Sequence, residues 1–355
     1  MVGAGSFGTA VALLLDRAGV RTTLLCRTEE QAKEVDKARV NERYLPGVEL
    51  PPGLKVRALG NRPDQFERPD LLFLAVPSKT FGEAVDELRR IGVSERAGIV
   101  SLAKGLVPPD GALPTLLLES AFGPDRVACV GGPAHARELV EAGAGLVCAS
   151  HSEALAHRVT EVFQEAGTVC EVSSDPVGAE LAGVAKNAAA VAVGATQGQG
   201  LNAAGMAAAD IFLEVLSLAE RSGGQARTFV GRAGTGDLVA TALASGSRNR
   251  TAGELLAQGV PARDIPGRIG QAVEALETVP LLSDAIERAG VEAPVTTALA
   301  RLIDGSLPLD RWIELVRTKQ PAPARFRRPR TWWARLRGWW RRAFGGSAAE
   351  GPSAP

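Results

Sequence analysis

Gly3-Ala4-Gly5-Ser6-Phe7-Gly8 is the stretch of sequence that decides the fold. Glycines at this spacing let the backbone of a tight turn approach a pyrophosphate held at a helix N-terminus. A helical pattern, Thr9 to Ala18, follows at once, and a short apolar run then ends at Cys26. A glycine loop in this setting indicates a dinucleotide-binding Rossmann unit, whereas alone it would indicate only a tight turn. We therefore expect Gly3, Gly5, Ser6, Phe7 and Gly8 to bind a dinucleotide cofactor.

The segment before the glycine loop is unusually short. Only Met1 and Val2 precede Gly3, although a Rossmann unit normally has a strand of about five residues there. Either the natural start lies upstream, or the first strand is truncated and the centre of the sheet is incomplete.

Apolar runs of strand length alternate with helical patterns until about residue 175, which predicts a doubly wound parallel sheet. The expected strands are Thr22 to Cys26, Leu71 to Val76, Gly98 to Ser101, Val127 to Val130, Ala144 to Ala149 and Thr168 to Val172. Beyond Pro176, alanine-rich stretches such as Glu180 to Ala195 and Ala203 to Arg221 predict helices. The fold class is therefore α/β, with a Rossmann-type domain at 1–176, an all-helical domain at 177–320 and a basic tail at 321–355.

Composition excludes several classes of protein. Lysine plus arginine and aspartate plus glutamate both number 40, so no global field favours nucleic acid, and no nucleic-acid partner is expected. Four widely spaced cysteines form no C-x-x-C pair and share no ligand spacing with the three histidines, which predicts a reduced cytoplasmic setting without a metal site. We see no secretory signal, and no apolar run approaches the roughly 20 residues that cross a bilayer.

The tail carries the densest charge of the chain. Between Arg325 and Arg342 there are eight arginines and no acidic residue, and aromatic side chains recur at helical spacing from Trp332 to Phe344. One interpretation is an amphipathic helix over 325–344 that contacts an anionic membrane, at the inner face, as a peripheral anchor. The alternative is a disordered, solvated tail.

The residue after the second strand bears on cofactor choice. NAD enzymes tend to place an acid there, but this chain has Arg27, whose guanidinium suits the 2′-phosphate of NADP. We expect NADP or NAD as cofactor, with NADP at least accepted. In the alternative, Arg27 is a solvated surface residue and Glu29 or Glu30 turns toward the ribose.

An ordered set of motifs resembles the NAD(P)-dependent glycerol-3-phosphate dehydrogenase family over about residues 1 to 317. After the glycine loop the motifs are Asn41 to Gly47, Ala75 to Ser78, Ala103 to Leu106, Gly132-Pro133 with Ala136, Lys186-Asn187, Gly236 to Leu238, Ser247 to Asn249 and Glu274. The resemblance implies reversible reduction of dihydroxyacetone phosphate by NAD(P)H to sn-glycerol 3-phosphate for glycerophospholipid synthesis. It also implies a homodimer.

Reduction of a ketone needs a proton donor, and a lysine in an apolar setting or near other cations can have its pKa lowered for that task. Lys186 lies in an alanine-rich stretch almost free of other charges. By resemblance Lys186 is the catalytic acid/base, Asp237 orients it or the substrate hydroxyls, and Lys104 polarises the carbonyl. Without the resemblance, Lys104 would be interpreted as an ordinary lysine in a surface loop.

A phosphorylated substrate needs an anion site, and Ser247-Arg248-Asn249 offers hydroxyl, guanidinium and amide donors. For Ser247 alone, a helix N-cap is the ordinary explanation. The resemblance completes the expected substrate set with Lys104, Gly132, Ala134, Lys186, Asn187, Asp237 and Thr241. It completes the cofactor set with Tyr44, Pro77, Lys104, Ala136, Arg248, Ala272 and Glu274, the last of which is alternatively an exposed helix glutamate.

Two positions depart from the family pattern. Ala134 replaces a serine or threonine, and Ala209-Asp210-Ile211 stands where the family has Thr-Arg-Gly. Two alternative functions therefore stay open. One is a related two-domain NADP-dependent reductase of another hydroxy acid, and the other is a catalytically silent cofactor-binding homologue.

Overall fold

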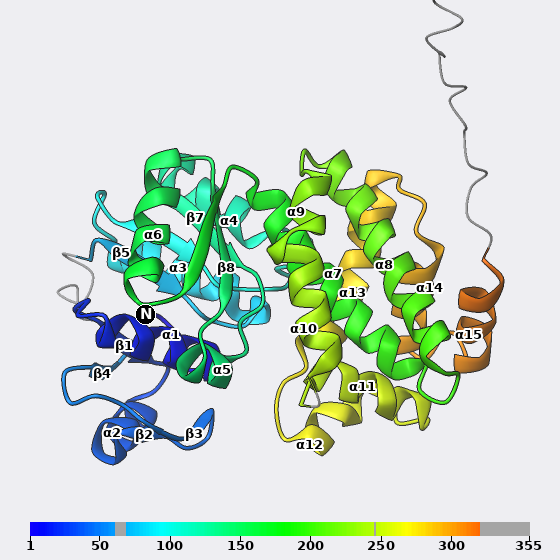
Figure 1. The fold of residues 1–355 in the computed structure, drawn as a ribbon, viewed down its shortest axis with the longest axis horizontal. Helices are drawn as coiled ribbons and strands as arrows, with labels where there is room; N and C mark the ends of the chain where they lie inside the picture. Colours follow the sequence, from blue (N-terminus) through cyan, green and yellow to red (C-terminus); the bar gives the residue numbers. More distant parts are fainter. Residues whose placement is uncertain (61–68, 245, 320–355) are drawn as a thin grey trace, which may run out of the picture. The chain divides into compact units, whose positions relative to one another are not determined.

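The computed structural model describes residues 1–60, 69–244 and 246–319. Met1–Thr318 form one compact unit, shown in Figure 1. Strands end at Ser173 and a long helix begins at Pro176, but the division into two domains at residue 176 stays a prediction. The predicted amphipathic segment 325–344 lies outside the described residues.

The six expected strands appear in the predicted order, and three further strands, at 40–41, 45–49 and 55–58, were not expected. The strands are β1 (Thr23–Cys26), β2 (Val40–Asn41), β3 (Leu45–Glu49), β4 (Lys55–Ala58), β5 (Leu71–Leu74), β6 (Gly98–Ser101), β7 (Val127–Gly131), β8 (Gly145–Ser150) and β9 (Val169–Ser173). The helices among them are α1 (Ser6–Arg17), α2 (Glu29–Ala38), α3 (Phe81–Ile91), α4 (Pro114–Phe122), α5 (Ala136–Glu141) and α6 (Glu153–Glu165). After them come α7 (Pro176–Ala195), α8 (Leu201–Arg221), α9 (Ala226–Val230), α10 (Asp237–Leu243), α11 (Arg248–Ala257), α12 (Ile265–Ile269), α13 (Glu274–Ala289), α14 (Pro294–Ile303) and α15 (Leu309–Thr318).

Met1 to Gly3 occupy the place of the short first strand. The amide of Val2 donates to the carbonyl of Phe73 at 2.8 Å, and the amide of Ala75 donates back to Val2 at 2.8 Å. On the other side, the amide of Leu25 donates to the carbonyl of Met1 at 2.8 Å. Met1 to Gly3 thus form a minimal bridge between β1 and β5, and the glycine loop follows at the carboxyl ends of these two strands.

The sheet is parallel except at one pair. β1 pairs with β4, β5 with β6, β6 with β7 and β8 with β9 in parallel, but β7 and β8 are antiparallel. The expectation of a parallel sheet is therefore wrong at this junction. The short helix α5 packs against α1 and does not cross back over the sheet, so the chain returns in the opposite direction (Figure 1).

The helical part is built around α7, which is buried almost throughout. Its small residues let α11 approach backbone to backbone: a Cβ added to Gly194 would lie 2.0 Å from the carbonyl oxygen of Arg250, and one added to Gly253 would lie 2.0 Å from that of Val191. Both predicted long helices are confirmed as α7 and α8. This close packing lies in the C-terminal half of α7, and Lys186 near the middle of the helix is also buried.

One helix bears on the expectation that no apolar run is long enough to cross a bilayer. Among the described residues, α8 is long and apolar enough by length and composition to cross a bilayer. However, Ile211, Val215 and Leu218 on its inner face are buried in the helical core. A core helix of this kind passes the same compositional test.

Candidate active site

Three charged side chains from distant parts of the chain meet at one point. Lys104 Nζ donates to Asp237 Oδ2 at 2.7 Å and to the carbonyl oxygen of Gly132 at 2.9 Å. Lys186 Nζ lies 3.6 Å from Asp237 Oδ1 and donates to Thr241 Oγ1 at 3.3 Å. One carboxylate therefore lies between two ammonium groups, while the catalytic roles of these residues stay predictions.

Burial and neighbouring charge shape the titration of this cluster. Burial lowers the pKa of Lys186 to about 8, with Asp237 opposing that shift and Lys104 adding to it. Burial alone would raise the pKa of Asp237, but Lys104 and Lys186 overcome this effect and lower it. Asp237 is thus a stable anion, while Lys186 can gain or lose a proton near neutral pH.

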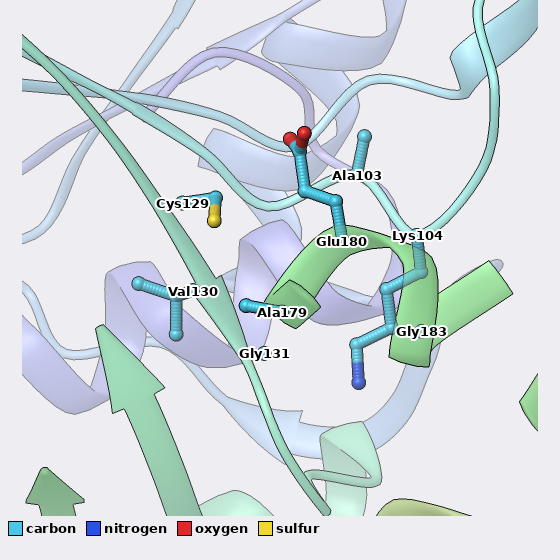
Figure 2. Close-up of a pocket in the computed structure, with 8 residues that line it drawn as sticks. All are labelled: Ala103, Lys104, Cys129, Val130, Gly131, Ala179, Glu180 and Gly183. Atoms are coloured by element: carbon cyan, nitrogen blue, oxygen red, sulfur yellow. The ribbon is translucent and has the colours of Figure 1, made fainter. Parts of the chain in front are cut away.

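Local backbone features position the residues of this charge cluster. The π-helical turn η4 (Arg232–Gly236) leads directly into Asp237, and Thr241 follows one turn later on α10. A Cβ on Gly234 would lie 2.1 Å from the carbonyl oxygen of Phe229, so this turn needs glycine. The Lys104 side chain runs beside Gly183 of α7, where a Cβ would lie 3.6 Å from Lys104 Cβ (Figure 2).

A chain of amides continues the cluster toward α11. Asn249 Nδ2 donates to Asn187 Oδ1 at 2.8 Å, and Asn187 Nδ2 donates to the carbonyl oxygen of Lys104 at 3.0 Å. Arg248 is exposed, and its guanidinium donates to Gln271 Oε1 at 3.0 Å and to the carbonyl oxygen of Ala272 at 3.3 Å. The structure thus brings most of the predicted substrate residues together.

Ser247 caps α11, accepting from the amide of Arg250 at 3.4 Å, as the N-cap interpretation predicted. Ala134 is half-buried and packs against the core of the sheet domain. Whether either residue also contacts a substrate stays a prediction.

The glycine loop fits an anionic cofactor. Gly3 has φ +103°, and a Cβ on Gly8 would lie 2.1 Å from the carbonyl oxygen of Gly3. A Cβ on Gly5 would meet nothing within 4 Å, and no side chain caps the N-terminus of α1. The loop is therefore closed on its inner side and open at Gly5, where a pyrophosphate would meet free helix amides.

Asn41 supports this loop and was missed as a single residue, although it opens one of the motifs. Its Nδ2 donates to the carbonyl oxygen of Ala4 at 3.0 Å and to Thr9 Oγ1 at 2.8 Å. The position of this asparagine at the start of a conspicuous motif was the available signal.

The remaining cofactor predictions have different outcomes. Glu274 is half-buried and accepts from Ser78 Oγ at 2.6 Å, so the interpretation as an exposed helix glutamate is wrong. Arg27, Glu29 and Glu30 are all exposed, which leaves both interpretations of cofactor choice open. Half-buried Tyr44 lies under the guanidinium of Arg43, Pro77 precedes the short turn η2 (Ser78–Thr80), and Ala136 begins α5.

Comparison with known proteins identifies the family of the chain. The model of the NAD-dependent glycerol-3-phosphate dehydrogenase N-terminus matches residues 1–156, and that of the C-terminus matches residues 175–314. A glycerol-3-phosphate dehydrogenase (NAD(P)+) of Alcanivorax borkumensis is 33% identical over 317 residues, 88% of this chain and 92% of the relative. One from Deinococcus radiodurans is 36% identical over 313 residues, 86% of this chain and 90% of the relative.

A solved structure of the Coxiella burnetii glycerol-3-phosphate dehydrogenase superposes with a TM-score of 0.80 at 28% identity, covering 90% of this chain and 98% of that one. Similarity thus extends over both the sheet and the helical parts. The chain belongs to the NAD-dependent glycerol-3-phosphate dehydrogenase family.

Proposed function

We propose that the protein catalyses reversible hydride transfer between NAD(P)H and dihydroxyacetone phosphate, giving sn-glycerol 3-phosphate for glycerophospholipid synthesis. Its family supports the reaction. The observation that carries the proposal is the position of Asp237 between Lys104 and Lys186. Two cations around one buried carboxylate suit a reaction that builds negative charge on a ketone oxygen and then protonates it.

Lys186 is the acid and base in this proposal. In reduction its ammonium gives a proton to the carbonyl oxygen, so an N–H bond breaks as the new O–H bond forms; in oxidation the neutral amine takes that proton back. A pKa of about 8 leaves both forms accessible at physiological pH. Lys104 stabilises the developing charge on the oxygen, and Asp237 orients both lysines.

NAD or NADP would lie at the glycine loop and supply or accept the hydride. Gly3, Gly5, Ser6, Phe7 and Gly8 would hold its pyrophosphate, supported by the open side at Gly5. Near the ribose, the guanidinium of Arg27 would bind the 2′-phosphate of NADP. Tyr44, Pro77, Lys104, Ala136, Arg248, Ala272 and Glu274 would complete the site.

The substrate phosphate would meet donors at the start of α11. Arg248 is exposed and already close to Ala272, while Asn249 is coupled to Asn187. A guanidinium and adjacent amide donors bind phosphate oxygens well. Gly132, Ala134, Thr241 and Ser247 would border the rest of the substrate.

Assembly and location form a separate part of the proposal. We propose a homodimer in the cytoplasm, with the 325–344 tail contacting anionic membrane at its inner face. Cys26, Cys129, Cys148 and Cys170 are free and buried, which suits a reducing compartment. Sedimentation with anionic liposomes, comparing the full chain with a version ending at Gln320, tests the membrane contact; equal supernatant fractions would exclude it.

The catalytic proposal is tested by following NADPH and NADH oxidation with dihydroxyacetone phosphate. We expect turnover in the wild type, loss of it in Lys186→Ala, and wild-type rates in Lys33→Ala, which removes an exposed lysine in a surface ion pair. Turnover only of an unphosphorylated ketone would favour the related reductase. Cofactor binding without turnover of any ketone would favour the silent homologue.

A further inference from the structure

A buried carboxylate outside the lysine cluster joins α7 to the start of α4. Glu180 is 4% exposed and accepts from the amide of Thr115 at 3.1 and 3.3 Å, one distance to each oxygen. It also accepts from Thr115 Oγ1 at 2.6 Å. Thr115 is the second residue of α4, so Glu180 binds the N-terminus of that helix.

This contact fixes one end of the loop that carries Lys104. The loop connects β6 to α4 over residues 102–113, and the contact of Glu180 with Thr115 holds its far end on α7. Near the other end, Asn187 of the same helix donates to the carbonyl oxygen of Lys104 at 3.0 Å. Both attachments are thus on the helix that carries Lys186, six residues after Glu180 in the sequence.

Glu180 does not take part in the charge cluster directly. Figure 2 shows its carboxylate pointing away from the ammonium of Lys104, with both residues bordering a small cavity next to Gly183. The cavity measures about 10 Å³, close to the space that one water needs, so no substrate enters between them. Glu180 therefore contacts the end of the Lys104 loop and not the charge cluster itself.

A second buried glutamate makes the same kind of contact elsewhere in the chain. It serves as a control for the effect of helix capping alone. Glu214 on α8 is also 4% exposed and accepts from the amides of Val295 and Thr296 at 3.1 and 2.8 Å and from Thr296 Oγ1 at 2.7 Å. It binds the N-terminus of α14, which carries none of the proposed site residues. Both glutamates thus stabilise a helix start, but only Glu180 does so at the loop of Lys104.

We propose that Glu180, acting through Thr115, is a positioning residue that holds the Lys104 loop in register with Lys186 on α7. The inference rests on the proposed function for its kinetic consequences. Misplacement of a catalytic group by about 1 Å costs on the order of 100-fold in rate. Because Lys104 acts on charge that develops in the transition state, loosening of its loop lowers kcat more than it raises KM.

The test compares Glu180→Ala with Glu214→Ala, and Thr115→Val with Thr296→Val. We expect kcat for dihydroxyacetone phosphate to fall about 10- to 100-fold in Glu180→Ala, and by less in Thr115→Val. Both control variants should lose stability but keep the wild-type kcat and KM at a temperature where they are folded. Glu180→Gln and Thr115→Ser retain an oxygen for the contact and should restore most of kcat.

If Glu180→Ala does not fold, the threonine pair carries the comparison, because Thr115→Val removes only one hydroxyl. Wild-type kcat in folded Glu180→Ala or Thr115→Val, or an equal loss in the matched control, overturns the proposal. Amide hydrogen exchange provides a readout that does not depend on turnover. Faster exchange over residues 102–117 in the Glu180 and Thr115 variants alone is expected, and unchanged exchange there overturns the proposal even if the wild type proves inactive on this ketone.

Discussion

Lys186 Nζ lies 3.6 Å from Asp237 Oδ1, farther than the 2.7 Å that separates Lys104 Nζ from the other oxygen of the same carboxylate. Asp237 is therefore bonded mainly to Lys104, and Lys186 is left with a weaker partner in a buried setting. Because burial outweighs that partner, the pKa of Lys186 falls to about 8.

The two directions of the reaction should show opposite pH dependence. Ketone reduction needs the charged form of Lys186, so kcat should fall as pH rises through about 8. Alcohol oxidation needs the neutral form, so its kcat should rise through the same pH. Initial rates in both directions from pH 6 to about 10 check this; parallel profiles would assign the proton transfer to another group.

Asp237→Asn should move that break to lower pH. The carboxylate raises the pKa of Lys186 against the effect of burial, and the neutral amide removes this support while Lys104 remains cationic nearby. The kcat of ketone reduction should then begin to fall at a lower pH than in the wild type. It should also be lower than the wild-type kcat at every pH. Glu277→Gln, which breaks the exposed pair with Lys79, is the control and should keep the wild-type profile; an unshifted break in Asp237→Asn would contradict the coupling.

Gly5→Ala and Gly8→Ala should separate cofactor binding from folding. A Cβ at Gly5 meets nothing within 4 Å, so this variant should keep its melting temperature but bind NADPH and NADH at least about 10-fold more weakly. At Gly8 the Cβ would lie 2.1 Å from the carbonyl oxygen of Gly3, so this variant should lose stability. Calorimetric titration and thermal unfolding measure the two effects, and unchanged cofactor affinity in Gly5→Ala would exclude a pyrophosphate at this turn.

Gly253→Ala and Gly205→Ala should have opposite effects on stability, although both lie in helices. A methyl group at Gly253 would meet the backbone of α7 at 2.0 Å, at a cost on the order of 1 to 3 kcal/mol or more. Gly205 on α8 has nothing within 4 Å, so alanine there should stabilise by roughly 0.5 to 1 kcal/mol. Denaturant unfolding measures both, and equal free energies of unfolding would contradict the close contact of α7 with α11.

Local sequence was sufficient for six of the nine strands in the described residues, for the two long helices and for the glycine loop. Gly3 and Gly8 meet a backbone requirement that other residues do not, because Gly3 has φ +103° and a Cβ on Gly8 would lie 2.1 Å from the carbonyl oxygen of Gly3. Alanine-rich stretches mark α7 and α8. These features depend on neighbours within a few turns of chain, so a single sequence contains them. The ordered motifs named the family for the same reason, since each is a short stretch with its own geometry.

Contacts between distant segments were decided only by the tertiary structure. Lys104 and Asp237 are 133 residues apart, and Thr115 and Glu180 are 65 apart, so no local pattern pairs them. The reversal of β8 and the bridge formed by Met1 to Gly3 likewise depend on which surfaces pack together. The sequence by itself determined the family and the order of the candidate site residues along the chain. Only the packing of α7 against the Lys104 loop and α10 decided which of them share a carboxylate, because burial and charge act through space and not along the chain.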